Sequence, residues 1–267
     1  MQTRQARRAR LRDLDALATK VAAAGIPRTP APDQLLAAVG RLARQLAAAK
    51  SSATVADVAA AAHRLFERSL AAAPAKVPMA CKQGCAWCCY NAVSATVPEI
   101  LLVAQAAAAK RMLDRPSVQN LIAAAAGLSG PDRMGRKIAC PMLEDAGCAI
   151  YAQRPTMCRV ANSTDVAACI DEYEGRNLTA DIPMARAPVD HGFNARVVLV
   201  AAIRACGFEA SAYDLAAGLG AGAFEAAAAR WLAGEPAWEG VTTTPLDPQV
   251  DALARDLAEA WRSLAAG

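Results

Sequence analysis

The amino-acid sequence predicts a mainly α-helical protein in which alanine-rich helices enclose a loop-rich cysteine module. Hydrophobic residues make up 55% of the 267 residues and aromatic residues only 4%. This composition suits closely packed helices, because strands favour β-branched and aromatic side chains. Apolar residues recur at helical spacing on both sides of the middle of the chain. Eight of the nine cysteines fall between Cys81 and Cys169, in a stretch rich in turn-forming residues.

Residues 1–76 are expected to form an N-terminal helical region. Apolar residues at helical spacing predict helices over 11–21, 33–46 and 52–70. The sequence Pro-Ala-Lys-Val-Pro at 74–78 is typical of a linker into the next region.

Residues 77–176 are expected to form the cysteine-cluster module. Thr96-Val-Pro-Glu99 is a capping-box pattern, and it predicts a helix that runs to Met112. A shorter helix is predicted over 117–127. The segment from 140 to 158 is rich in residues that favour turns.

Residues 177–267 are expected to return to alanine-rich helix. The clearest segments are 193–206, 221–232 and a last helix that carries Val250 to Trp261. No internal repeat at a fixed period is present.

Charge and segment composition exclude several classes of protein. The net charge of +4, from 29 basic and 25 acidic residues, is too balanced to predict nucleic-acid binding. Five arginines precede Asp13, and they indicate either an anionic partner or a solvated helix start: Arg4, Arg7, Arg8, Arg10 and Arg12. No apolar run predicts a secretory signal or a membrane span. The expected compartment is therefore the cytoplasm, where cysteines persist as thiols or metal ligands.

Four cysteines lie in the nine-residue run from Cys81 to Cys89. If the run is helical, Cys81, Cys85 and Cys88 share one face. If it is a turn, the Cys85-x2-Cys88 spacing is typical of a metal knuckle. Thiolates packed so closely repel one another unless a cation neutralises them. Because successive side chains diverge, the adjacent Cys88 and Cys89 indicate two metals, a cluster, or one ligand beside one packed thiol.

Metal binding is therefore the predicted chemistry. The candidate metal ligands are Cys81, Cys85, Cys88, Cys89, Cys140, Cys148, Cys158 and Cys169. Tetrahedral zinc takes four ligands, and a cubane iron–sulfur cluster also takes four. Eight thiolates could therefore form two such sites, or one site with four cysteines that bind no metal. The sequence does not decide between a zinc ion and an iron–sulfur cluster, and it does not decide which cysteines share a metal. Cys206 lies alone in an apolar helix and is expected to be core.

The cysteine pattern resembles the YkgJ-like, or CxxCxxCC, family of bacterial proteins, a zinc- or iron-chelating group. The matching residues are Cys81-x3-Cys85-x2-Cys88-Cys89, Cys140-Pro-x-Leu143, and Gly147-Cys148-x-Ile-Tyr-x2-Arg154-Pro-x2-Cys158-Arg159. The resemblance covers about a third of the chain, and it implies metal binding. The spacing after Cys81 is three residues where the family's nickname has two. Flagellin lysine methylases are similar in this motif, which implies an iron–sulfur enzyme as one alternative.

Five other side chains, near the motif or in the helices, are candidates for a role at the site or in packing. Arg154 and Arg159 either compensate the charge of the thiolates or hold a turn, with Arg159 paired to an acid. Tyr151 is expected to pack over the site. His63 is expected to be a packed or surface residue, and His191 is a reserve ligand in a loop.

Three functions are compatible with these features. The first is a cytosolic metal-binding protein whose cysteine module holds zinc or an iron–sulfur centre. The second is an iron–sulfur enzyme, whose catalytic residues and other cofactors the sequence does not identify. The third is a metal carrier or storage protein with exposed ligands. The glycines at 218–222 follow no predicted strand, so they do not indicate a phosphate loop.

Overall fold

The computed structural model of the chain describes residues 32–73, 78–82, 84–177 and 181–265. The helix predicted over 11–21 and the arginines before Asp13 lie outside these residues. Helices dominate the described part, which confirms the mainly α prediction. The helices are α2 (Pro32–Ala47), α3 (Ser52–Ala71), α4 (Val97–Ala109), α5 (Pro116–Ala125), α6 (Gly130–Gly135), α7 (Thr156–Val160), α8 (Val166–Tyr173), α9 (Arg186–Ala205), α10 (Leu215–Ala221), α11 (Phe224–Leu232) and α12 (Pro248–Ala265).

The remaining elements are short. Two 3₁₀ turns are present, η1 (Trp87–Tyr90) and η2 (Tyr151–Gln153). The strands are β1 (Ser94–Thr96), β2 (Leu143–Glu144), β3 (Gly147–Cys148), β4 (Ala212–Asp214) and β5 (Thr243–Thr244). β1, β4 and β5 form an antiparallel sheet in the order β1-β4-β5, and β2 and β3 form a hairpin. None of these strands was predicted, because two or three residues carry no period that sequence alone can reveal.

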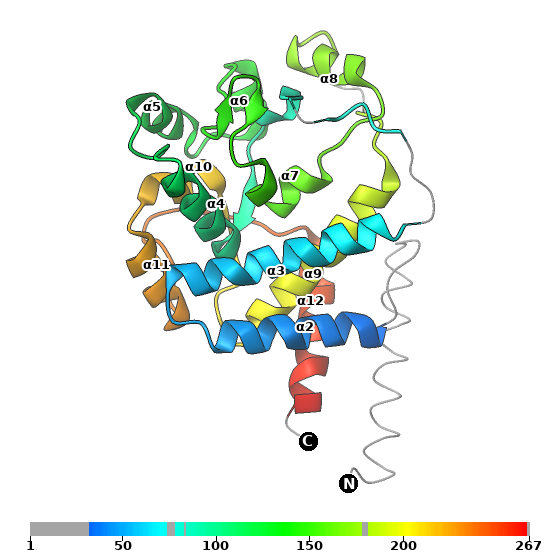
Figure 1. Cartoon of the computed structure of the whole chain (residues 1–267), viewed down its shortest axis with the longest axis vertical. Coiled ribbons are helices and arrows are strands. Elements are labelled where there is room, and N and C mark those ends of the chain that lie inside the picture. The colour runs from blue at the N-terminus through cyan, green and yellow to red at the C-terminus, as the bar shows by residue number, and fades with distance from the viewer. Residues whose placement is uncertain (1–31, 74–77, 83, 178–180, 266–267) are drawn as a thin grey trace.

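Helix α9 is the centre of the hydrophobic core. Every residue from Val197 to Ile203 is buried, as expected for a helix covered on all sides. α2, α3, α7 and α12 all pack against it. Figure 1 shows α2 and α3 crossing in front of α9. α9 begins at Arg186, seven residues before the predicted start, so the prediction that His191 lies in a loop is wrong.

The other predicted helices are found with shifted ends. The capping box at Thr96 is confirmed, since the Thr96 backbone N–H donates to Glu99 Oε2 at 2.9 Å at the start of α4. The helix predicted over 221–232 is found as α11, which begins at Phe224, and a shorter helix that was not predicted, α10, precedes it. Gly222 and Ala223 both have positive φ, at 59° and 45°, and this breaks the run.

The glycines of 218–222 serve packing. A strand, β4, does lead into α10, contrary to the prediction that no strand precedes these glycines. A Cβ added at Gly218 would lie 2.8 Å from Ile100 Cδ1, so glycine here lets α10 lie against α4. Gly192 plays the same part on α9, because a Cβ there would lie 1.8 Å from Val160 Cγ1 on α7.

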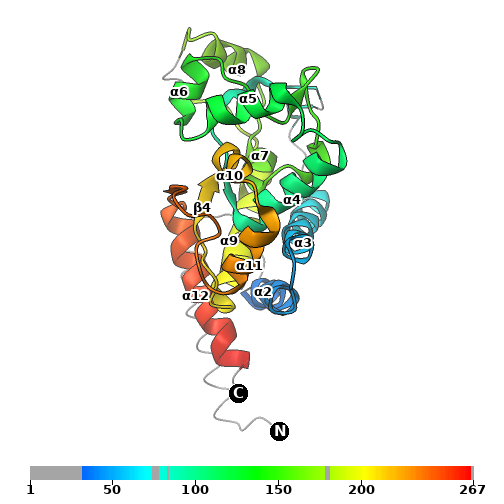
Figure 2. The same ribbon diagram turned by 90° about the vertical axis from the view of Figure 1, so that its left-hand side faces the viewer.

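Three helices of the cysteine module lie at one end of the molecule. Figure 1 and Figure 2 both place α5, α6 and α8 at the opposite end from α2 and α12. One hydrophobic core includes residues from α2 and α3, from α4, and from α9 to α12. The division of the chain at 76 and 176 into three regions stays a prediction. None of the described helices is long and apolar enough to cross a bilayer.

Candidate metal centre

Turns and short helices carry the eight candidate cysteines. Cys81 and Cys85 lie in irregular chain before η1, where Gly84 has a φ of 91°. The structure therefore favours the turn over the helix for this run. Cys88 and Cys89 lie in η1, and Cys148 lies in β3. Cys158 and Cys169 lie in α7 and α8, which the sequence did not predict. All nine cysteines of the chain are free thiols.

A tight hairpin positions Cys148. β2 and β3 pair Leu143 with Cys148, which leaves Asp145 and Ala146 as a two-residue loop. Both loop residues have positive φ, 47° and 59°, as the favoured two-residue hairpin turns require. The hairpin therefore returns the chain and holds Cys148 beside the segment that follows Cys140.

Three of the eight candidate cysteines lie against the hydrophobic core: Cys140, Cys148 and Cys158. Burial raises the pKa of Cys140 to about 11 and the pKa of Cys158 well above its ordinary value. Burial also raises the pKa of Cys148. Cys89 joins these three through the backbone, because the Cys140 N–H donates to the Cys89 carbonyl at 2.6 Å. These thiols favour the protonated form until a cation compensates their charge.

Cys81 and Cys169 lie apart from the core, on either side of one turn. The backbone N–H of Ser163 donates to Cys81 Sγ at 3.1 Å. The thiol of Cys169 donates to the carbonyl of Asp165 at 3.8 Å. Burial raises the pKa of both thiols, and the charges of Cys85 and Cys88 raise it further. Cys81 and Cys169 are thus affected by the same two thiols, although Cys169 comes from a separate segment, α8.

Cys88 and Cys89 differ sharply despite being neighbours. Their side chains hydrogen-bond to each other, and this bond lowers the pKa of Cys88 to about 7 while it raises the pKa of Cys89. The positive charge of Arg154 also favours the thiolate of Cys88. Cys88 is exposed and Cys89 is half-buried. Cys88 is therefore the thiol of the pair that more readily forms a thiolate.

The thiols are not yet gathered around one point. Among the described residues, no three Cys, His, Asp or Glu side chains form a ready-made metal site. The donor set itself fits zinc or an iron–sulfur cluster, since both take thiolate sulfur. The elements that carry the thiols are turns, a hairpin with a two-residue loop, and short helices. Binding would then order the module around the ion.

Arg154 supplies positive charge to the cysteines. Its guanidinium stacks 3.7 Å from the centroid of the Tyr151 ring. Its charge opposes the rise in pKa that burial causes at Cys148 and at Cys158. Its Nε is buried and has no hydrogen-bond partner in the described part of the chain. Of the two roles weighed for this arginine, the structure favours compensation of thiolate charge.

Arg159 has the other role. It donates to Glu67 Oε1 at 2.5 Å and to the carbonyl oxygens of Arg154, at 2.9 Å, and Ala152. These bonds hold the turn that carries Arg154 against α3. Arg159 therefore fixes the backbone of the module, as the pairing with an acid predicts.

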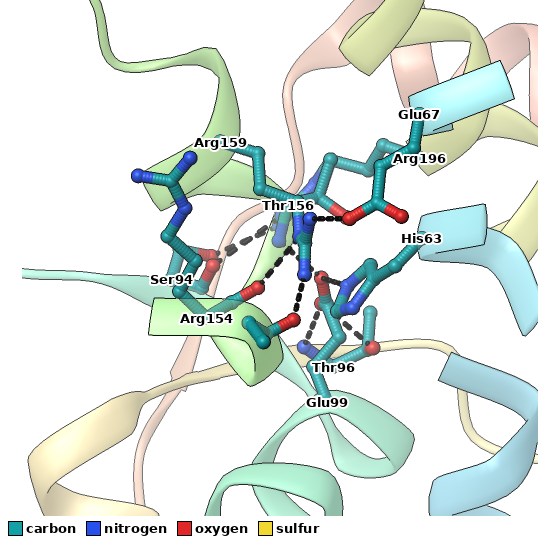
Figure 3. A network of polar contacts seen from close by, with 10 residues as sticks. His63, Glu67, Ser94, Thr96, Glu99, Arg154, Thr156, Arg159 and Arg196 are labelled. Atoms are coloured by element: carbon teal, nitrogen blue, oxygen red, sulfur yellow. Dashed lines mark hydrogen bonds and ion pairs between the residues drawn. The ribbon is translucent and has the colours of Figure 1, made fainter. Parts of the chain in front are cut away.

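A buried polar network ties the module to the core, and Figure 3 shows it. Glu99 is fully buried on α4. Its Oε1 accepts from the Thr156 N–H at 2.7 Å and lies 3.4 Å from His63 Nε2. Burial alone would raise the pKa of Glu99, but His63 and the positive charge of Arg196 hold it well below its ordinary value. The network links α3, α4, α7 and α9.

Sequence reasoning identified only part of this network. It found Glu99 as a capping residue, and it expected His63 to be packed or on the surface; the structure confirms that His63 is packed. The available signal was the position of His63 on the apolar face of a helix, between Ala62 and Phe66. His191 does not approach the cysteines in any contact of the described residues, so nothing supports it as a reserve ligand. Cys206 packs against the core, and its thiol donates to the Ala43 carbonyl at 3.3 Å.

A large cavity lies next to the module. Its volume is about 1110 Å³, and residues of α5, α10 and β5 line it. Asp214 also lines it and lies 3.4 Å from Arg133 NH2. The charges of Arg133 and Asp214 both act on the thiol of Cys140. No cysteine lines the cavity, and Asp214 connects the two regions, since it lines the cavity and its charge acts on Cys140.

This arrangement defines a helical protein with a thiol-rich, metal-chelating module. Residues 80–179 match the model of the CxxCxxCC family, described as a putative zinc- or iron-chelating domain. The resemblance read from the cysteines is therefore confirmed over this segment, which is less than half of the chain. No curated protein and no solved structure matches the chain.

Proposed function

We propose that this chain is a cytosolic metal-binding protein whose cysteine module holds zinc or an iron–sulfur centre. The observation that carries the proposal is that eight free thiols, from six separate elements and turns, lie close enough for their charges to act on one another in a connected series. The match to a zinc- or iron-chelating domain over the same residues supports it. The ligands would be the eight cysteines from Cys81 to Cys169.

The chemistry of the module favours a bound cation. Burial raises the pKa of Cys140, Cys158 and Cys169. There is therefore a free-energy cost to deprotonating these thiols. A metal cation removes that cost, because it replaces the proton and binds the thiolate directly. When bound, the metal would supply a fixed positive centre that cross-links the turns. The residues around it, Arg154 first, would balance the remaining negative charge.

Metal content is the first test. Protein purified under nitrogen without chelators is expected to contain stoichiometric zinc, or iron with sulfide and a broad visible absorption. Removal of the metal is expected to lower the melting temperature, because a bound metal stabilises the folded state. The Cys206→Ser variant is the matched control, and its metal content should equal that of the unmodified chain. The proposal would be contradicted if the purified protein contains no metal and its melting temperature does not change when zinc or iron is added.

An iron–sulfur enzyme is the second candidate function, and the cavity is the observation that favours it. Small-molecule sites typically occupy about 300–1,000 Å³, and this cavity, at about 1110 Å³, lies just above that range. Asp214 gives its largely apolar wall a buried carboxylate. The pair of Arg133 and Asp214 would connect a bound molecule to Cys140.

Thermal shift assays test this second candidate. S-adenosylmethionine and other candidate small molecules are expected to raise the melting temperature of the metal-loaded protein. Ala123→Trp should abolish the shift, since Ala123 lines the cavity, while Ala124→Trp on the next exposed residue should not. A shift that survives Ala123→Trp would place binding elsewhere, and a zinc protein with no shift would exclude the enzyme.

A further inference from the structure

We infer that the cavity beside the cysteine module binds an amine, a largely apolar molecule whose protonated amino group hydrogen-bonds to Asp214. The cavity has a volume of about 1110 Å³, which is enough for a molecule of cofactor size. Binding of an amine here rests on the second candidate function for the use of this cavity, and it adds the charge and the polarity of the ligand.

Segments that are far apart in the sequence build the wall of the cavity. They include α5 with the chain that follows it to Ser129, α10, and the chain from Gly240 to β5. α5 and α10 pack against each other (Figure 2), and a Cβ added at Gly220 of α10 would lie 2.9 Å from Ile122 Cγ2 of α5. Most of the wall consists of alanine, glycine and branched aliphatic residues. The cavity therefore offers contact area to an apolar molecule and few hydrogen bonds.

The charge of the wall is negative. Asp214 is the one charged side chain among the described residues that line the cavity. Phosphates and carboxylates need a positively charged partner when they are buried. No lysine, arginine or histidine of the described chain lines this cavity. Ligands whose polar group is an anion are therefore disfavoured, and a positively charged group is favoured.

Asp214 has one carboxylate oxygen without a partner. The residue is 7% exposed, and its Oδ1 accepts from the Ala217 N–H at 2.9 Å and from Arg133 NH2 at 3.4 Å. Its Oδ2 is buried and has no hydrogen-bond partner within the part of the chain that the structure describes. A buried acceptor that stays unpaired costs free energy. A donor on a molecule in the cavity would remove that cost.

Other polar side chains of the wall already have partners within the protein. The hydroxyls of Ser94 and Thr244 lie 2.9 Å apart and hydrogen-bond to each other. Gln119 Nε2 donates to a backbone carbonyl at 3.1 Å, and the Ser129 hydroxyl donates to a carboxylate of its own turn at 2.6 Å. The polar anchor for a ligand is therefore Asp214.

Arg133 compensates the charge of Asp214 only in part. Its guanidinium also donates to the Ala125 carbonyl, at 3.1 and 3.2 Å, and to the Asn91 carbonyl at 3.3 Å, all shorter than its contact with Asp214. Burial raises the pKa of Asp214, although Arg133 and nearby backbone N–H groups lower it. A charge-assisted hydrogen bond is stronger than one from a neutral hydroxyl. A protonated amine is therefore the donor that compensates this carboxylate best.

Binding of three matched probes to the full-length chain tests this assignment. Naphthylmethylamine, naphthylmethanol and naphthoate share one ring system and carry an ammonium, a hydroxyl and a carboxylate. The amine should bind at least about tenfold more tightly than the carboxylate, with the alcohol between them, as one charge-assisted hydrogen bond predicts. Isothermal titration calorimetry measures the three dissociation constants.

Two variants locate the site of binding. Asp214→Asn removes the charge and keeps an oxygen that caps α10, because asparagine caps helices as well as aspartate does. It should weaken binding of the amine about tenfold and change binding of the alcohol by less than about threefold. Ala123→Trp in the cavity wall should weaken binding of all three probes, while Ala124→Trp on the next exposed residue should weaken none.

Other outcomes overturn the assignment. Equal affinity for the amine and the carboxylate would do so, as would an amine preference that survives Asp214→Asn, or no binding of any probe. If Asp214→Asn does not fold, Ala123→Trp still decides the result, because an amine preference that survives it arises outside the cavity. Amine binding that Asp214→Asn weakens, in a protein that contains no iron and does not bind S-adenosylmethionine, would refute the enzyme and support the amine site.

Discussion

Replacing Glu99 with glutamine is expected to lower the free energy of unfolding by about 3–5 kcal/mol, because it removes one partner of a buried ion pair. Glu99 is fully buried and accepts from three groups, the Thr96 N–H and hydroxyl and the Thr156 N–H. Glutamine offers one acceptor oxygen, and its amide would face donors. His63 and Arg196 would lose the negative charge that they face. Urea unfolding measures the difference.

A matched substitution controls for the loss of a charge alone. Glu239 pairs with Arg230, but its side chain is 79% exposed. Because exposed ion pairs contribute about 0–1 kcal/mol, Glu239→Gln should change stability by less than about 1 kcal/mol. Equal effects of Glu99→Gln and Glu239→Gln would show that the buried network contributes no more to the free energy of unfolding than an exposed ion pair does.

The pH dependence of this effect has a definite sign. The folded-state pKa of Glu99 lies well below its ordinary value of 4.5. A carboxyl with a lowered pKa stabilises the fold fully above the unfolded-state pKa, and that stabilisation is lost as the pH falls toward the folded-state value. The difference between the unmodified chain and Glu99→Gln should therefore be constant above about pH 5 to 6 and shrink below pH 4.5. A difference that grows in acid would contradict this.

Replacing Arg133 with methionine is the second large expected effect, again about 3–5 kcal/mol of unfolding free energy. Arg133 is 1% exposed, and it donates to the Ala125 carbonyl at 3.1 and 3.2 Å and to the Asn91 carbonyl at 3.3 Å. It also faces Asp214, whose pKa burial raises and whose charge would lose its partner. The bond to Asn91 anchors the chain that leaves η1, so metal retention should fall as well.

The neighbouring Arg136 provides the control. It lies one turn away near the end of α6 and is exposed. Arg136→Met should change stability by no more than about 0.5 kcal/mol, as surface substitutions usually do. Thermal unfolding and metal content, measured together on both variants, check the prediction. Normal stability in Arg133→Met would mean that solvent replaces the lost bonds.

Much of the helical architecture could be predicted because it depends on local signals. The period of apolar residues placed α2, α3, α4, α5 and α12 within a few residues of their observed ends. The capping box at Thr96 and Glu99 also involves residues three positions apart. Such signals are carried by neighbours in the chain, which the sequence displays directly.

The small sheet and the buried charges could not be predicted. β1 pairs with β4 across more than a hundred residues, with Ala95 opposite Tyr213, and each strand is only three residues long. Arg133 meets Asp214 and Arg159 meets Glu67 across similar separations. No periodicity or motif links these partners, because only the packed fold brings them together.

The sequence alone determined that this protein is helical and that a dense group of thiols at 81–169 calls for a cation. Both conclusions follow from local composition and from the repulsion between neighbouring thiolates. The tertiary structure decided how the cysteines are placed: which lie on the core, which hydrogen-bond to Ser163 or Asp165, and which arginine faces them. Burial and long-range hydrogen bonds fix these positions. Both depend on distances in space between residues that are far apart in the chain.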